Sequence, residues 1–141
     1  MIAIGSDHAG YEFKERIKKL LEELGEKYID FGTHSNESCD YPDYAKKVAQ
    51  SILNKECTKG ILICGTGIGM SIAANRFKGI RAAVCLNEYM AKVSRTHNNS
   101  NILAIGERTT PWVEVQRIVK VWLNSEFEGG RHLNRIEKMD Q

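Results

Sequence analysis

The chain has 141 residues, with 20 Lys and Arg against 18 Asp and Glu, and a formal net charge of +2 at neutral pH. This length suits one domain, which we expect to span residues 1–141 and to bury a core without disulfides or metals. The balanced charge argues against an extended nucleic-acid surface, and no apolar run approaches membrane-spanning length. Four cysteines without a Cys-x-x-Cys pair, and no signal peptide before the first apolar run, lead us to expect a cytoplasmic protein with small-molecule partners.

The first third of the chain alternates predicted strands and helices. Residues 1–5 and 27–31 are short apolar runs that we predict to be strands, and residues 32–42 are predicted to form a loop. The intervening helix ends at Gly25 and has apolar residues at helical spacing, namely Phe13, Ile17, Leu20, Leu21 and Leu24. The buried face of a second helix consists of Ala45, Val48, Ala49 and Ile52.

Polar residues follow the first predicted strand. Ser6 or Asp7 could simply cap the helix that begins there. His8 lies outside the apolar stripe of that helix and beyond the carboxyl end of a strand, where open parallel sheets bind ligands. Asp7 and His8 are therefore candidate site residues.

The centre of the chain, residues 59–75, is an apolar run that changes into three alternating glycines and then into helix formers. We predict a strand, an anion-sized loop and a helix, because Gly65, Gly67 and Gly69 allow backbone amides to converge. Cys64 ends the strand, where the amides and the helix start favour a thiolate. Core packing alone would also account for a cysteine here. A nucleotide-binding module, with the loop on a pyrophosphate and Glu88 on a ribose, is the alternative of a different class.

The remaining predicted elements repeat the alternation. Strands are expected at residues 80–85 and 102–106, with a helix from about Asn87 between them and a long helix after Pro111. The tail breaks at Gly129 and Gly130 and then restarts as a helix. Each strand is thus followed by a helix, which predicts a three-layer α/β/α doubly wound parallel sheet. In such a sheet strands one and three lie side by side, so Asp7, His8 and Cys64 should face one crevice.

Two further groups of polar residues lie towards the C-terminus. His97, at the end of the fourth helix, is either an exposed cationic cap or a residue that transfers protons near neutral pH. Arg131 and Arg135 are four residues apart on one helical face, where like charges repel unless an anion such as phosphate lies between them. A solvated basic face is the other interpretation of this pair.

Four motifs, taken together, resemble the ribose-5-phosphate isomerase B family, which also contains galactose-6-phosphate and allose-6-phosphate isomerases. They are Gly5-Ser6-Asp7-His8-Ala9-Gly10, the stretch from Cys64 to Ser71, the pair His97-Asn98, and Gly130-Arg131-His132-x-x-Arg135. The resemblance spans nearly the whole chain and implies strand order 2-1-3-5-4, whereas the generic doubly wound order is 2-1-3-4-5. It also implies interconversion of ribose 5-phosphate and ribulose 5-phosphate through a cis-enediolate, without a metal or organic cofactor.

The family resemblance implies a role for each matching residue. Cys64 would be the base and His97 would open the sugar ring, with Asp7 assisting and Asn98 positioning the sugar. The loop amides, together with Thr66, would hold the enediolate oxygen, and the loop residues concerned are Gly65, Gly67, Ile68 and Gly69. Phosphate would bind to His8, Arg131 and Arg135, and Tyr41 would line the sugar pocket. Family members are dimers or tetramers, so we expect a homodimer or tetramer whose site is shared between subunits.

Overall fold

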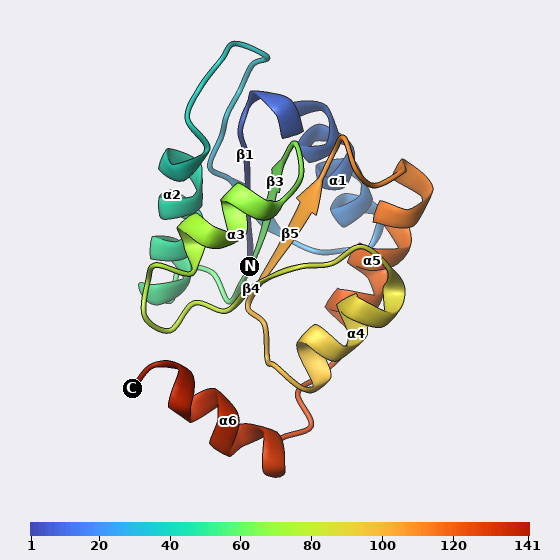
Figure 1. The fold of residues 1–141 in the computed structure, drawn as a ribbon. Helices are drawn as coiled ribbons and strands as arrows, with labels where there is room; N and C mark the ends of the chain where they lie inside the picture. The colour runs from blue at the N-terminus through green and yellow to red at the C-terminus, as the bar shows by residue number, and fades with distance from the viewer.

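The computed structural model describes residues Met1–Gln141 and contains one five-stranded parallel sheet (Figure 1). Its strands are β1 (Ile2–Ser6), β2 (Tyr28–Asp30), β3 (Lys59–Cys64), β4 (Ala82–Val84) and β5 (Ile102–Gly106). Their spatial order is β2-β1-β3-β5-β4. The order implied by the family resemblance is therefore confirmed, and the generic order 2-1-3-4-5 does not apply.

Helices cover both faces of the sheet (Figure 1). One face packs against α1 (Tyr11–Glu23), α4 (Glu88–Thr96) and α5 (Trp112–Asn124). The other face packs against α2 (Tyr41–Leu53) and α3 (Ile68–Ala74). A single 3₁₀ turn, η1 (His8–Gly10), links β1 to α1. The predicted three-layer doubly wound fold is confirmed.

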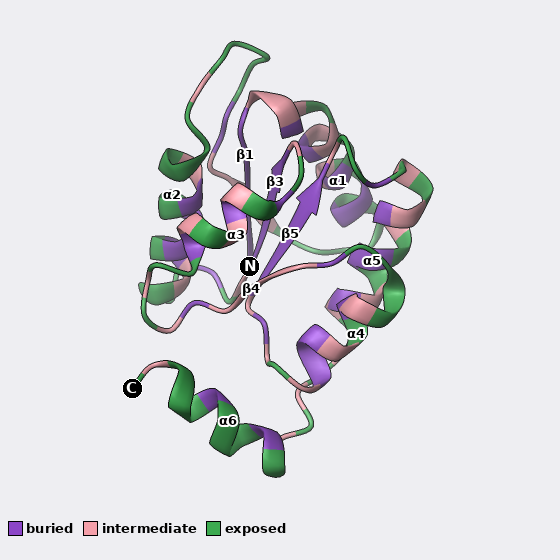
Figure 2. Cartoon of the chain, in the orientation of Figure 1, coloured by how far each residue is buried: buried purple, intermediate pink, exposed green.

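The three central strands are apolar on both sides because both faces of the sheet are covered. In β3, Ile61 and Ile63 belong to the core beneath α1, α4 and α5, whereas Leu62 and Cys64 belong to the core beneath α2 and α3. Figure 2 shows β1, β3 and β5 as buried along their lengths. Burying each large apolar side chain stabilises the fold by about 1.5–3 kcal/mol. Cys64 is thus attached to a strand that is buried on both faces.

The two edge strands are shorter than the sequence predicted. β2 and β4 each have three residues, against the predicted ranges 27–31 and 80–85. Each edge strand pairs on one side only, and β4 starts late because the Ile80 amide donates to Phe77 O in a turn. Ile80 and Cys85 are nevertheless buried, which explains why an apolar pattern alone overestimated the strand.

The C-terminal helix α6 (Arg131–Met139) lies at the end of the molecule opposite the β3–α3 loop (Figure 1). It buries His132 and Ile136, and the Asp140 carboxylate that follows it accepts a hydrogen bond from the Gly79 amide. No helix in the fold combines the length and the apolar character needed to cross a membrane.

Candidate active site

The β3–α3 loop turns around the sulfur of Cys64. The Gly67 amide donates a hydrogen bond of 3.1 Å to Cys64 Sγ. Gly67 adopts φ +80°, and a Cβ atom at this position would lie 3.1 Å from the carbonyl carbon of Ile105. Only glycine meets both constraints, so this residue is required for the loop to close on the sulfur.

The rest of the loop presents groups that face away from the core. Thr66 is exposed, and its Oγ1 accepts a 3.2 Å hydrogen bond from the Ile68 amide. The hydroxyl hydrogen of Thr66 therefore remains free to donate to another oxygen. Tyr41, the first residue of α2, covers Gly69 so closely that a Cβ on the glycine would lie 2.7 Å from the ring. The Tyr41 ring therefore lies against the glycine loop, beside the surface where the sugar pocket was predicted.

The end of β1 lies beside the end of β3, as the sequence predicted. The Asp7 amide donates to the carbonyl of Ile63 in β3. Asp7 Oδ1 accepts from the Gly10 amide at 3.1 Å, so this carboxylate caps η1. Capping occupies one of its two oxygens, and the side chain stays at the same edge of the sheet as Cys64.

A hydrogen bond fixes the tautomer of His8. The Cys39 amide donates to His8 Nδ1 at 3.2 Å, and a backbone amide can only donate. Neutral His8 must therefore carry its proton on Nε2, which makes Nε2 a hydrogen-bond donor. His8 can thus bind an anion even when its ring is uncharged.

Sequence reasoning missed the contribution of β5 to this edge. Gly106 pairs with Cys64 in the sheet, so the residues after β5 emerge beside the glycine loop. The Arg108 amide donates to Gly65 O at 3.0 Å, and its guanidinium lies 3.2 Å from where a Cβ on Gly65 would be. The rule that selected the ends of β1 and β3 would have selected Glu107 and Arg108 had β5 been known to neighbour β3.

Glu107 is held beside the site by backbone contacts. Its amide donates to Cys64 O, and its carboxylate accepts from the Phe13 amide at 2.8 Å. Burial raises the pKa of Glu107, although the hydrogen bond from Phe13 acts in the opposite direction. This carboxyl therefore ties the start of α1 to the end of β5.

Four predicted site residues lie near the amino-terminal ends of the strands, opposite the glycine loop; this end of the sheet is called the far edge below. α4 returns antiparallel to the strands, so His97, its C-cap, comes out near the start of β5, and the exposed Asn98 follows it. The sheet register places Gly60 opposite Ile102 and Cys64 opposite Gly106, so the two edges are about 13 Å apart at 3.3 Å per residue. Arg131 and Arg135 in α6 lie at this far edge, exposed and without an ion pair (Figure 1).

The far edge also holds a histidine that was not selected as a site residue. The His97 ring stacks on His132, with centroids 4.3 Å apart and planes at 13°. Burial lowers the pKa of His132, and the positive charges of His97 and Arg131 lower it further. His132 belongs to the quoted tail motif, and only its distance from the other motifs in the sequence concealed its contact with His97.

No cavity within one chain is lined by Cys64. The largest cavity, about 360 Å³, lies at the far edge and is lined by residues that include Asn98, Arg81 and Asp140. The two smaller cavities lie on the α1–α5 and β4–α4 sides, and neither is lined by Cys64. In a single chain the glycine loop is therefore an open surface, and enclosing a substrate there requires additional walls.

The fold argues against the nucleotide-binding alternative, because Glu88 does not lie beside the glycine loop. Glu88 follows β4, and β5 separates β4 from the glycine-bearing strand β3. Two strand spacings place Glu88 about 10 Å to the side of the loop. In a dinucleotide site the acidic residue instead follows the strand next to the glycine-rich turn.

The whole chain is similar to proteins of known class. Residues 2–139 match the family model described as Ribose/Galactose Isomerase. The ribose-5-phosphate isomerase B of Escherichia coli (strain K12) is 50% identical over 136 residues, which cover 96% of this chain and 91% of that protein. The ribose-5-phosphate isomerase B structure from Clostridium thermocellum has a TM-score of 0.98 at 55% identity, covering 99% of this chain and 94% of that chain. A ribose 5-phosphate isomerase structure from Thermotoga maritima has a TM-score of 0.97 at 55% identity, with 99% and 96% covered.

The fold and these likenesses define an isomerase. The chain belongs to the Ribose/Galactose Isomerase family, and the resemblance seen in its four sequence motifs is confirmed.

Proposed function

We propose that this enzyme interconverts ribose 5-phosphate and ribulose 5-phosphate by moving a proton between C2 and C1 through a cis-enediolate. The observation that carries the proposal is the hydrogen bond from the Gly67 amide to Cys64 Sγ. It holds the sulfur at the mouth of a loop of backbone amides, where a substrate bound by those amides would lie beside it. Membership of an isomerase family supports the same chemistry.

In the proposed proton transfer, Cys64 takes the C2 proton of the open-chain aldose. The C1 carbonyl oxygen becomes the enediolate oxygen, held by the amides of Gly65 to Gly69 and by the free hydroxyl hydrogen of Thr66. Cys64 then returns the proton to C1, while the proton of the C2 hydroxyl passes to the C1 oxygen, so that C1 ends as an alcohol and C2 as the carbonyl. The reaction is redox-neutral and needs a base, a proton donor and anion-binding groups, all of which this chain carries.

The phosphate would be bound by donors from both edges of the sheet. His8 donates from Nε2, because its Nδ1 accepts the Cys39 amide. Arg131 and Arg135 are exposed, form no ion pair and lie on one face of α6, so both are free to bind an anion bidentately. Arg108, beside Gly65, adds a cationic group next to the glycine loop.

Ring opening must precede proton transfer, and we assign it to His97, with Asp7 and Asn98 contacting the sugar hydroxyls and Tyr41 lining the pocket. Because His97 lies about 13 Å along the sheet from the Cys64 edge, the two residues would serve one substrate only if they came from different subunits. We therefore propose a homodimer or tetramer in which the far edge of one subunit encloses the glycine loop of its partner. The absence of a Cys64-lined cavity in one chain supports this arrangement.

Galactose 6-phosphate and allose 6-phosphate are the alternative substrates, and the family description includes galactose isomerases. Five- and six-carbon aldose phosphates share the phosphate and the reacting carbons. Their discrimination depends on about one methylene of pocket depth, worth roughly 1–3 kcal/mol.

Proton NMR in heavy water tests the proposed reaction. Ribose 5-phosphate, allose 6-phosphate and galactose 6-phosphate are each incubated with catalytic amounts of the enzyme. We expect ribose 5-phosphate to be converted fastest, with solvent deuterium at C1 of the ketose, because a thiol proton exchanges with solvent. Faster conversion of a six-carbon sugar would overturn the substrate assignment. A ketose that contains no solvent deuterium because the C2 hydrogen of the substrate is retained at C1 would indicate direct hydride transfer and would overturn the enediolate.

A further inference from the structure

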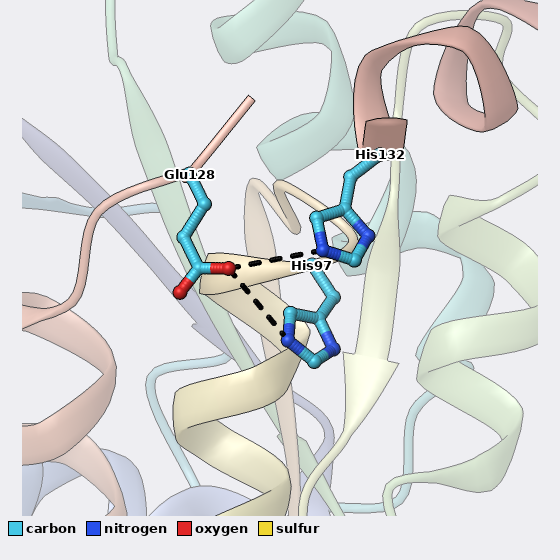
Figure 3. Close-up of side chains that lie close together, drawn as sticks. All are labelled: His97, Glu128 and His132. Carbon is cyan, nitrogen blue, oxygen red and sulfur yellow. Dashed lines mark ion pairs between the residues drawn. The ribbon is translucent and has the colours of Figure 1, made fainter. Parts of the chain in front are cut away.

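Three potential metal ligands meet at the far edge of the sheet, outside the glycine loop (Figure 3). Glu128 Oε1 lies 3.8 Å from His97 Nε2 and 3.7 Å from His132 Nε2. One ligand atom from each of the three residues lies within 4.8 Å of the others. Figure 3 shows the Glu128 carboxylate directed at both rings, which come from different elements.

The backbone holds these three residues together. The Glu128 amide donates to Thr96 O at 3.0 Å, which ties the α5–α6 segment to the end of α4. The backbone amide of His97 donates to Val93 O, and the backbone amide of His132 donates to Gly129 O. The fold therefore fixes the main-chain positions of the three residues, which come from α4, the segment before α6 and α6 itself.

The donor set selects a particular class of ion. Two imidazoles and one carboxylate form the ligand set of open Zn²⁺ sites, which leave a fourth position for water or another ligand. Ca²⁺ and Mg²⁺ prefer oxygen ligands and would leave both imidazoles unused. Ligands of a tetrahedral ion with bonds of 2.0–2.1 Å are about 3.4 Å apart. The two Glu128–imidazole separations slightly exceed this spacing, the full set spans up to 4.8 Å, and the two stacked rings must turn for their nitrogens to converge on one ion. The side chains of His97 and Glu128 are 42% and 59% exposed, so both can rotate to close the shell.

We propose that His97, Glu128 and His132 form a binding site for Zn²⁺ that regulates the enzyme by withdrawing His97 from catalysis. A metal-bound nitrogen of His97 has no lone pair with which to accept a proton from a sugar hydroxyl. Arg131 and Arg135 carry positive charge on the same helix and weaken cation binding, which suits a reversible inhibitor rather than a permanent structural ion. The inhibitory role rests on the proposed function of His97, whereas the metal site itself does not.

Imidazole NMR tests the site directly, because the chain has only four histidines. Long-range proton–nitrogen spectra are recorded while Zn²⁺ is added to the full-length protein. We expect the His97 and His132 resonances to shift together and saturate at one Zn²⁺ per chain, at lower concentrations than any shift of His8 or His34. A titration in which His97 and His132 do not shift, or in which His8 shifts first, would overturn the proposal.

Matched variants separate ligation from general electrostatics. Glu128→Gln removes the third ligand, whereas Glu126→Gln removes the same charge two residues away, at an exposed position outside the cluster. Glu128→Gln should weaken Zn²⁺ binding at His97 and His132 by at least about tenfold, the loss typical even of outer-shell partners, with Glu126→Gln unchanged. Equal effects of the two substitutions, or no effect of either, would contradict a Glu128 ligand.

Activity measurements then test regulation separately. Zn²⁺ should inhibit the wild-type enzyme over the concentration range in which the His97 resonance shifts, and Glu128→Gln should require at least about tenfold more. If NMR shows binding but inhibition does not follow it, the regulatory role fails while the metal site stands. If no sugar phosphate is converted at all, the proposed function fails, and the NMR titration still decides whether the site exists.

Discussion

The two ends of the parallel strands, the carboxyl edge with the glycine loop and the far edge with α6, differ in how far hydrogen bonds within one chain already hold the candidate site residues in place. At the carboxyl edge, hydrogen bonds already fix the sulfur of Cys64, the tautomer of His8 and the carboxylate of Asp7. At the far edge, the two arginines of α6 are exposed and unpaired, and His97 is partly exposed. The first edge therefore resembles a preorganised reaction centre, and the second a set of binding groups that still lack a ligand. If both edges serve one substrate, as we propose, each subunit carries the two parts of the site at opposite ends of its strands.

The largest expected effect is at the preorganised edge. Cys64→Ala should lower kcat by roughly 10²–10⁴-fold, the contribution typical of a positioned general base. Cys39→Ala is the matched control, because it removes a thiol near His8 and keeps the backbone amide that binds His8 Nδ1. Steady-state kinetics of both variants check the comparison. Comparable losses of kcat in the two variants would show that Cys64 is not the base.

A second prediction concerns the stability of the preorganised edge. Asp30, at the end of β2, accepts hydrogen bonds from the fully buried Lys14, from Lys18 and from the Gly32 amide. Asp30→Asn leaves the buried Lys14 charge with only its more exposed partner Glu15, at 3.1 Å, which should lower the free energy of unfolding by about 3 kcal/mol. Urea unfolding at neutral pH measures this loss. A change below the error of the extrapolation would mean that Glu15 alone is a sufficient partner for Lys14.

The same carboxylate predicts a pH dependence. Burial acts to raise the pKa of Asp30, but hydrogen bonds from Lys14 and Lys18 outweigh it and hold the pKa below its ordinary value of 3.8. A carboxyl with a lowered pKa stabilises the fold above its unfolded pKa, and this stabilisation is lost as the pH falls through the folded value. Wild-type stability should therefore fall below pH 3.8, and Asp30→Asn should show a smaller fall. Parallel acid profiles for the two proteins would contradict the assignment.

A smaller effect is expected at the far edge. Arg135→Ala should raise KM for the sugar phosphate by roughly ten- to a hundredfold with little change in kcat, because it removes a charge-assisted hydrogen bond to the phosphate. Arg117→Ala is the control, since Arg117 is an exposed arginine on α5 whose ion pair is with Glu114 on the same helix. An unchanged KM in Arg135→Ala would mean that Arg135 does not bind the phosphate and belongs to a solvated basic face of α6.

The sequence predicted one edge of the site far better than the other. Alternating strands and helices, with polar residues after the first and third strands, were enough to bring Asp7, His8 and Cys64 together. Arg108 was missed because the position of β5 beside β3 is not encoded in hydrophobic periodicity, and the order 2-1-3-5-4 came only from the family resemblance. The predicted strand 80–85 was too long because Ile80 and Cys85 are buried although they lie outside the hydrogen-bonded strand β4.

The position of His97 followed from the topology, although the motif pattern alone suggested a single cluster. A crossover helix runs antiparallel to its strands, so a residue at its C-terminus must lie at the opposite edge from a residue at a strand's C-terminus. Its contacts with Glu128 and His132 depend on the irregular segment between α5 and α6, whose sequence has no periodic signal.

Subunit complementation tests the central claim most directly. Cys64→Ala and His97→Asn are each expected to be nearly inactive, and the two proteins are refolded together in equal amounts. If Cys64 and His97 of one site come from different subunits, half of the dimers are mixed and each has one intact site. About a quarter of the wild-type activity per subunit should therefore return. If the mixture is no more active than the two variants measured separately, although mass spectrometry shows mixed dimers, the shared site is contradicted.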